Sequence, residues 1–232
     1  MKSGGLMIVG VTFLALFSIL QLKSEKPMLN LRVFRYSSFR IAVILSLCMY
    51  LIAMGNAMVM PIFAKSLCGF SDTAYGLATI FGSVLSATAA LCAGKLYDKV
   101  GIRPVFMAGI GLFAVFSIMG LFLSQATSIL YIAIVFALQS VAMSTLNSPT
   151  TAMALGGLEG RERVDGSAIF NTLRQISSSL SSTLAVLIFT LAGSDITAVH
   201  SVYLYFALVT LAIAVAVIIY LRSKKAPYLP NA

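Results

Sequence analysis

The chain has 232 residues, of which 59% are hydrophobic and 10% are charged, and its formal net charge is +9. A water-soluble domain of this size exposes too much surface to hide that share of apolar side chains, so the composition excludes an ordinary soluble protein and indicates a lipid bilayer as the surrounding solvent. The basic residues lie between apolar blocks and form no basic stripe, which argues against nucleic acid as a partner.

The uncharged stretches of the sequence predict the membrane-spanning helices in chain order. A helix needs about 20 apolar residues to cross a hydrocarbon core of about 30 Å, and most gaps between charged residues have this length. The stretch 104–158 is longer and as one helix would run about 80 Å, so we divide it at the polar segment 124–128. We expect an all-α integral membrane protein of about seven transmembrane helices, at 4–22, 41–64, 73–94, 104–123, 129–155, 166–193 and 199–221.

The basic residues predict the orientation of these helices. All Lys and Arg residues except Lys2 and Lys65 lie in or next to every second loop between the expected helices, or in the C-terminal tail. Because cytoplasmic loops are enriched in Lys and Arg, we expect a multi-pass protein of the cell membrane with its N-terminus outside and its C-terminus in the cytoplasm. A cleaved signal peptide at 1–22 is the weaker interpretation, since no convincing small-residue cleavage site follows that segment.

No residue pattern indicates catalysis or a bound cofactor. Cys48, Cys68 and Cys92 have no metal-type spacing, and His200 has no ligand-type neighbour. The sequence also has no phosphate-binding glycine loop with a lysine, and no nucleophile beside a suitable base. We therefore expect neither an enzyme nor a metal or cofactor site.

Small side chains form stripes on two of the expected helices. Gly82, Ser86, Ala90 and Gly94 recur at every fourth position of one helix, and the segment 177–183 of another is almost entirely Ser and Thr. Small residues let helix backbones approach closely within a membrane. Two interpretations stand: these stripes pack inside the chain, or they dock on helices that the sequence does not contain.

Three segments resemble a family of membrane transporters. Residues 94–103, Gly-Lys-Leu-Tyr-Asp-Lys-Val-Gly-Ile-Arg, are similar to the cytoplasmic loop signature of the major facilitator superfamily, Gly-x-Leu-x-Asp-x-x-Gly-x-Arg/Lys. The segments 26–34 and 170–175 resemble the linker and the start of the penultimate helix in that family's fourteen-helix drug:proton antiporter branch, the EmrB/QacA type. The resemblance covers roughly residues 5–222.

This resemblance implies a fold and a function. Residues 41–222 would form the C-terminal six-helix half of the transporter as two inverted three-helix repeats, with 1–22 an extra central transmembrane helix, 23–40 a basic cytoplasmic linker and 223–232 a cytoplasmic tail. The implied activity is proton-coupled antiport of small amphipathic drugs by alternating access, together with an N-terminal half that the sequence lacks. Two alternatives stay open: a non-transporting membrane protein or inactive transporter remnant, and a small transporter made of two copies of the chain.

The resemblance also assigns a gate motif. Asp98 would pair with basic groups and a helix N-terminus, and this charged contact would hold one of two helix arrangements and break when the halves rock. The alternative is a solvated charged turn that only fixes the topology. The motif residues are Gly94, Asp98, Gly101 and Arg103.

Polar side chains inside the expected spans are candidates for a transport pathway. Arg174 lies about 12 Å into its helix, where a charge is costly, and Asn171 and Gln175 flank it at helical spacing. These three residues could line the cytoplasmic mouth of a cavity, or Arg174 could extend to the lipid headgroups. Pro61 and Pro149 are expected to kink their helices. The candidate cavity residues are Asn56, Gln139, Asn147, Asn171, Arg174 and Gln175.

Acidic residues are missing from the interior of every expected span. A proton-coupled exporter needs a titratable group with a shifted pKa inside the membrane. We therefore expect proton coupling to depend on residues of the other half.

Overall fold

The structure of the chain, a computed structural model, covers residues 30–193 and 195–222, and the side chains of all of these except 96–98, 100, 102 and 219–222. The expected helix 4–22, most of the linker and the tail lie outside the described residues. Within the described ranges the chain is all-helical, as predicted. Its elements are η1 (Leu31–Arg35), α2 (Ser37–Ile62), η2 (Phe63–Leu67), α3 (Asp72–Val100), α4 (Ile102–Gly120), α5 (Ile129–Leu155), α6 (Gly160–Leu191) and α7 (Ile196–Arg222).

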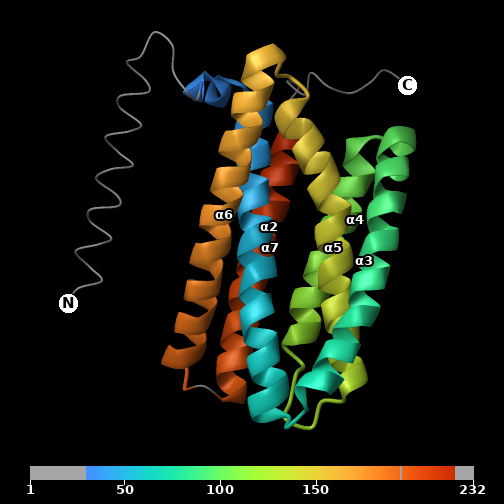
Figure 1. Cartoon of the computed structure of the whole chain (residues 1–232), viewed down its shortest axis with the longest axis vertical. Coiled ribbons are helices and arrows are strands. Elements are labelled where there is room, and N and C mark those ends of the chain that lie inside the picture. The colour runs from blue at the N-terminus through green and yellow to red at the C-terminus, as the bar shows by residue number, and fades with distance from the viewer. Residues whose placement is uncertain (1–29, 194, 223–232) are drawn as a thin grey trace, which may run out of the picture.

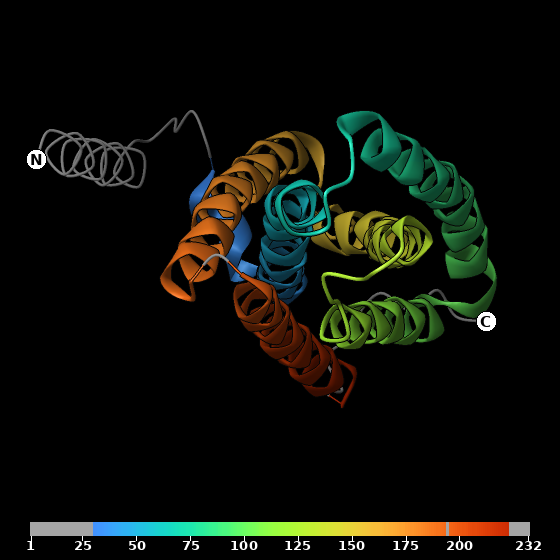
Figure 2. The same ribbon diagram turned by 90° about the horizontal axis from the view of Figure 1, so that it is seen from below.

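The long helices form two layers, which Figures 1 and 2 show from two directions. Helices α6, α2, α5 and α3 lie side by side in a curved layer, called the front layer here, and α7 and α4 lie behind α2 and α5. Helices α2 and α5 run in opposite directions, and α2 packs on α6 and α7 as α5 packs on α3 and α4. The units α2–α4 and α5–α7 are therefore related as inverted three-helix repeats, as the family resemblance implies.

Five helical stretches of the described chain are long and apolar enough to cross a membrane. A helix of 18 residues already covers about 27 Å, close to the thickness of the hydrocarbon core. The five stretches are Ser37–Leu67, Asp72–Lys95, Arg103–Gly120, Ile129–Leu155 and Ile196–Ile218.

Helix α6 has the length of a span, 32 residues, but not the apolar composition of the other five. Arg174 and the Ser/Thr segment 177–183 lower its hydropathy. Part of this polarity is hidden by packing, because Ser177 Oγ donates to the carbonyl of Leu47 at 2.8 Å and Ser181 Oγ donates in the same way one turn further along α2. This ridge of the serine stripe therefore packs inside the chain.

Helices α3 and α5 are in close contact at one end and separate toward the other. A Cβ atom at Gly82 would lie 3.1 Å from the Cα atom of Ala137, so the glycine permits the close approach. One turn further on, the hydroxyl oxygens of Ser86 and Ser144 are 2.6 Å apart. Around Gly94 an added Cβ would meet no described atom within 4 Å. The small-residue stripe of α3 thus packs on α5 over part of its length only.

Helices α4 and α7 meet at another glycine. A Cβ atom at Gly120 would lie 1.7 Å from the Cδ1 atom of Tyr203. The Tyr203 side chain is fully buried and packs against the rings of Phe116 and Phe206, with centroids 5.4 and 5.5 Å away. Gly120 therefore makes room for the largest side chain in this part of the core.

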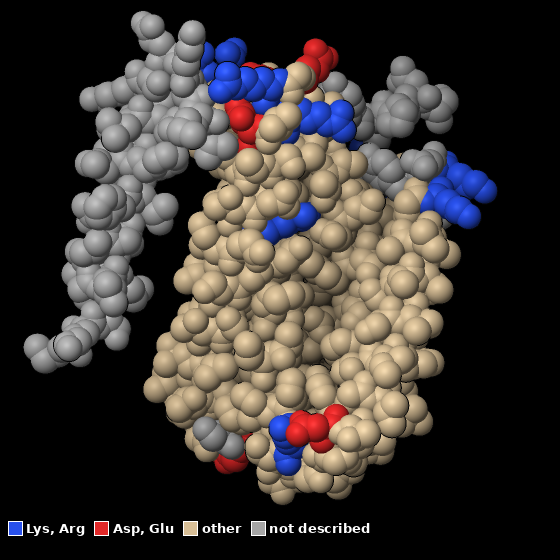
Figure 3. All heavy atoms as spheres, viewed as in Figure 1, with Lys and Arg blue, Asp and Glu red and all other residues tan. Residues whose placement is uncertain are grey.

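Charged side chains gather at the two ends of the bundle, and the face between them in Figure 3 is almost free of charge. Lys and Arg are concentrated at the end that carries η1 and the start of α6. At the opposite end Lys65 Nζ pairs with Asp72 Oδ1 at 2.7 Å. An uncharged band between two polar ends fits a hydrocarbon core.

Candidate functional site

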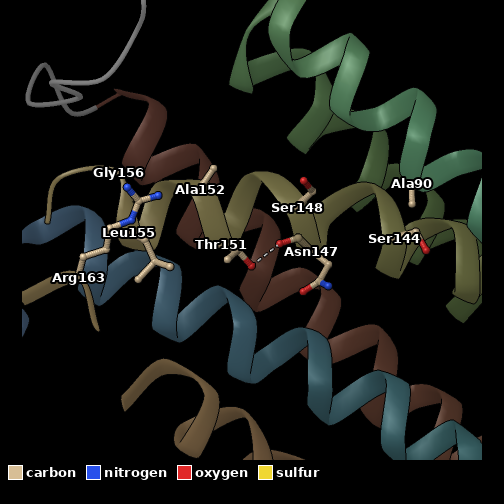
Figure 4. A pocket seen from close by; sticks show the side chains of 9 residues that line it. All are labelled: Ala90, Ser144, Asn147, Ser148, Thr151, Ala152, Leu155, Gly156 and Arg163. Atoms are coloured by element: carbon tan, nitrogen blue, oxygen red, sulfur yellow. Dashed lines mark hydrogen bonds between the residues drawn. The ribbon is translucent and has the colours of Figure 1, made fainter. Parts of the chain in front are cut away.

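A cavity of about 570 Å³ lies in the front layer, between α5 and the part of α3 around Ala90. Most of its wall is the C-terminal half of α5, α3 contributes Ala90, and Arg163 of α6 lies at one end (Figure 4). We call it the α5 cavity. Its polar lining residues are Ser144, Asn147, Ser148, Thr151 and Arg163.

Arg174 is held against the wall of the α5 cavity. Its Nη2 atom donates to Asn147 Oδ1 and to Thr151 Oγ1, both at 2.9 Å, and its Nε atom donates to Ser46 Oγ on α2 at 2.6 Å. The guanidinium carbon lies 4.1 Å from the ring centroid of Phe170. With 9% of the residue exposed, Arg174 points into the bundle between α2 and α5, and not toward lipid headgroups.

Asn171 and Gln175 lie on the exposed surface of α6, whereas Arg174 between them is buried. The structure therefore does not bring these three side chains to one wall. Ser179 and Thr183 are exposed as well. Because residues four apart share a helix face, they extend the exposed polar face that Asn171 and Gln175 begin.

Asn56 and Gln139 form a separate polar network in the core. Asn56 Nδ2 donates to Gln139 Oε1 at 2.6 Å, and Gln139 Nε2 donates to the carbonyl of Ala53 at 3.1 Å. The Tyr203 hydroxyl donates to Asn56 Oδ1 at 2.8 Å. The network joins α2, α5 and α7, and neither amide lines the α5 cavity. Of the six candidate residues, Asn147 lines this cavity and Arg174 binds its wall.

The gate motif lies where α3 passes into α4. Gly101 separates the two helices with a φ of 79°, a conformation that favours glycine. Gly94 and Asp98 belong to the last turns of α3, and Arg103 is exposed in the first turn of α4. The Asp98 side chain lies outside the described residues, so the gating role stays a prediction.

The two expected helix-breaking prolines lie in different surroundings. Pro61 is in the last turn of α2, and the wider π-helical turn η2 follows directly. Pro149 is buried in α5, between the cavity residues Asn147 and Thr151. Pro149 therefore interrupts the backbone hydrogen bonds of α5 at the cavity wall.

Thr151 and Ser46, two of the three hydrogen-bond partners of Arg174, are not among the candidate residues that the sequence indicates, and the third, Asn147, is a candidate without a predicted link to Arg174. Thr151 follows Asn147 by four residues, so helical spacing was a signal that could have found it. Ser46 lies 128 positions from Arg174, and no local pattern connects the two.

The end of the linker is fixed to the start of α6. The backbone N–H of Asn30 donates to Asp165 Oδ2 at 3.3 Å, and the Tyr36 hydroxyl donates to Glu162 Oε2 at 3.1 Å. The bond to the Glu162 carboxylate, together with its negative charge, raises the pKa of Tyr36. Val33 of η1 is fully buried. These contacts hold η1 at the basic end of the bundle.

Two inverted three-helix units, with five helices long and apolar enough to span a membrane, define a multi-pass membrane protein with the architecture of half a major-facilitator-type fold. The chain belongs to the Major Facilitator Superfamily, whose family model matches residues 42–232.

Individual relatives are transporters of this superfamily. The chain is 28% identical over 183 residues to the uncharacterized MFS-type transporter YhcA of Bacillus subtilis, covering 79% of the chain and 34% of YhcA. It is 29% identical over 184 residues to the lincomycin resistance protein LmrB of Listeria innocua, covering 78% and 38%. It is 21% identical over 180 residues to the multidrug export protein EmrB of Haemophilus influenzae, covering 77% and 35%. The chain thus spans between 34% and 38% of the length of these relatives.

Proposed function

We propose that this chain is the C-terminal half of a secondary active exporter, which moves small amphipathic drugs out of the cell by proton-coupled antiport and alternating access. It works with an N-terminal half that supplies the acidic residues for proton coupling. The names of LmrB, a lincomycin resistance protein, and EmrB, a multidrug export protein, support drugs as the substrate class.

The exposed polar face of α6 is the observation that carries this proposal. Asn171, Gln175, Ser179 and Thr183 are exposed side by side on this face. The amides of Asn171 and Gln175 would be costly facing hydrocarbon, since lipid offers no hydrogen bonds, whereas the Thr183 hydroxyl already donates to the carbonyl of Ser179 at 3.0 Å. The α5 cavity opens in the same layer of helices. A second helical half placed against the front layer would give both features polar neighbours and enclose a substrate pathway.

Drug accumulation tests the need for both halves. Cells that express the chain together with an N-terminal half should retain less of a fluorescent amphipathic drug than cells with either part alone. A protonophore should abolish the difference. Unchanged accumulation would favour the non-transporting alternative, and export by the chain alone as a crosslinkable dimer would favour the two-copy alternative.

The gate motif is tested in the same cells. Asp98→Asn should remove export without lowering the amount of chain in the membrane, because the charged contact that holds one arrangement is lost. Asp72→Asn is the matched control, since Asp72 lies at the opposite end in an exposed ion pair with Lys65. Export that survives Asp98→Asn would reduce the motif to a topological signal.

A further inference from the structure

The positive charge of Arg174 has no counter-charge in the part of the chain that the structure describes. The three acceptors of its hydrogen bonds, on Ser46, Asn147 and Thr151, are neutral hydroxyls and an amide. The ion pairs of the described side chains lie elsewhere, at Lys65 and Arg161. Buried charges in proteins are ordinarily paired, because removing an ion from water is expensive. An anion that reached this side chain would meet a positive charge that no described acidic residue neutralises.

One donor group of Arg174 remains available for such an anion. Its Nε and Nη2 atoms are engaged, whereas Nη1 has no hydrogen-bond acceptor among the described residues. Nη1 is also partly accessible. Among the described side chains, the Tyr205 hydroxyl is the only fully buried polar atom that has no hydrogen-bond partner. Since Nη1 has no partner either, it is not fully buried. Nη1 is thus the donor that the described residues leave without an acceptor, and Arg174 contacts the wall of the α5 cavity through Asn147 and Thr151 without itself being one of the lining residues.

The surroundings of Arg174 strengthen its attraction for an anion. The guanidinium carbon lies 4.1 Å from the centroid of the Phe170 ring and 5.4 Å from that of Tyr50. Aromatic neighbours exclude water, and a charge interacts more strongly where water is excluded.

The α5 cavity has the composition of an anion pocket next to this charge. Its wall includes Asn147 and Thr151, the acceptors of the Nη2 hydrogen bonds, and Arg163 adds a second cation at one end (Figure 4). None of the described residues that line it is acidic, and Leu155 and Ala90 give it apolar surface. Its volume of about 570 Å³ lies within the usual range for small organic ligands.

We propose that the α5 cavity binds the carboxylate of a small amphipathic organic acid, with Arg174 as the anion-binding residue and Arg163 as a second cation at the cavity mouth. This assigns a charge class to the substrate, and it rests on the proposed function only in treating the cavity as part of the substrate pathway. Arginine suits this role because its planar donors match the geometry of a carboxylate.

Binding to the purified 232-residue chain in detergent micelles tests the proposal. The probes are pyrenebutyrate and pyrenebutanol, which share one apolar skeleton and differ in a carboxylate or hydroxyl end, and fluorescence anisotropy gives the two Kd values. Pyrenebutyrate should bind roughly 10-fold or more tightly than pyrenebutanol, since a hydrogen bond to a charged group is the stronger kind. Equal Kd values for the unaltered chain would overturn the proposal.

Three substitutions locate the selectivity. Arg174→Gln should bring the ratio of the two Kd values close to one, mainly by raising the Kd of pyrenebutyrate. Arg163→Gln should lower the ratio less. Arg40→Gln, at an exposed arginine that bonds to Ser37, is the matched control and should leave the ratio unchanged. A ratio that survives Arg174→Gln would show that Arg174 only ties the helices together.

Asn147→Asp provides a test that keeps the shape of the site. The new carboxylate would replace an acceptor that is already 2.9 Å from Nη2, so it would neutralise Arg174 from within the chain. The variant should fold and lose the preference for pyrenebutyrate. If Arg174→Gln does not fold, Asn147→Asp still tests whether the charge of Arg174 binds the carboxylate. An Asn147→Asp variant that still prefers pyrenebutyrate would overturn the proposal.

The outcome is separate from that of the export assay. Selective binding without export would refute the proposed function and leave the anion site standing, and export without selective binding would do the reverse. If co-purification with the N-terminal half abolishes the selectivity, an acidic side chain of that half fills the site. That result would overturn the proposal that the site binds the carboxylate of a substrate.

Discussion

At the scale of single residues, the core network of Asn56, Gln139 and Tyr203 shows how polar groups are accommodated in the bundle. Asn56 is fully buried and Gln139 is 6% exposed, yet each amide has a partner at hydrogen-bond distance. A satisfied buried network of this kind adds little net stability, but loss of one partner leaves another group without a bond.

We expect Gln139→Leu to destabilise the purified chain by about 1–3 kcal/mol, because Asn56 Nδ2 loses its acceptor in the core. Unfolding by increasing SDS in detergent micelles measures this. Gln175→Leu makes the same chemical change at an exposed position, and we expect it to change stability by no more than about 0.5 kcal/mol. Equal effects of the two substitutions would contradict the role of the network.

Asp195 gives the chain a pH-dependent contribution at the start of α7. The hydroxyl of Thr197 and the backbone N–H groups of Thr197 and Ala198 donate to its Oδ1 atom, and these hydrogen bonds lower the pKa of Asp195. The unfolded chain then takes up this proton at a higher pH than the folded chain. The hydrogen bonds to the Asp195 carboxylate therefore stabilise the folded chain above the ordinary Asp pKa of about 3.9. This stabilisation is lost as the pH falls through the lower pKa that Asp195 has in the folded chain.

We expect the melting temperature in detergent to fall on acidification below about pH 4, and Asp195→Asn to reduce this acid-dependent fall. Asparagine also caps helices well, so the variant should change stability little near neutral pH. Melting curves over an acid series measure both effects. An identical acid dependence in the variant would exclude Asp195 as a contributor.

At the scale of helices, glycines set the distance at which neighbours pack. We expect Gly120→Ala to cost about 1–3 kcal/mol, because the new Cβ would lie 1.7 Å from the buried Tyr203 ring and force it to move. Gly111→Ala is the control in the same helix: nothing described lies within 4 Å of its Cβ position. Better helix propensity should make Gly111→Ala neutral or stabilising by up to about 1 kcal/mol. SDS unfolding of both variants measures the difference.

The sequence predicts most helices well because charge is excluded from the hydrocarbon. The gap after Arg103 and the break at 124–128 locate α4 and α5. Helix α6 begins at Gly160, six residues before the predicted start at 166, because the charged residues of its first turns are helical and do not form a loop. These charged residues can belong to a helix because this end of the bundle carries many other charged side chains and lies outside the uncharged band.

The candidate site was less predictable than the helices, because its contacts cross between distant segments. An intramembrane arginine and several amides stand out in the sequence, but the partners of each depend on which helices meet. Gln139 lies 83 positions from Asn56 and Ser46 lies 128 from Arg174. Asn147 and Gln139 are on the same helix, yet one lines the cavity and the other is in the core.

At the scale of the whole molecule, the distribution of basic residues predicts which end faces the cytoplasm. After replacement of the three native cysteines, we expect Lys65→Cys to react with a membrane-impermeant maleimide in intact cells. Arg40→Cys at the basic end should react only after permeabilisation. Both sites are exposed, and the Lys65–Asp72 ion pair that is lost is worth little at the surface. The reverse labelling pattern would invert the proposed topology.

The hydrogen bond between Asn56 and Gln139 also fastens the two inverted units to each other, since one amide belongs to α2 and the other to α5. Sliding one unit past the other would strand two amides in a dry interior, a far larger penalty than shifting apolar side chains over one another. The six helices would therefore travel as a single stiff block during a transport cycle. The displacement would then fall on the outer boundary of the block, against whatever faces α3 and α6.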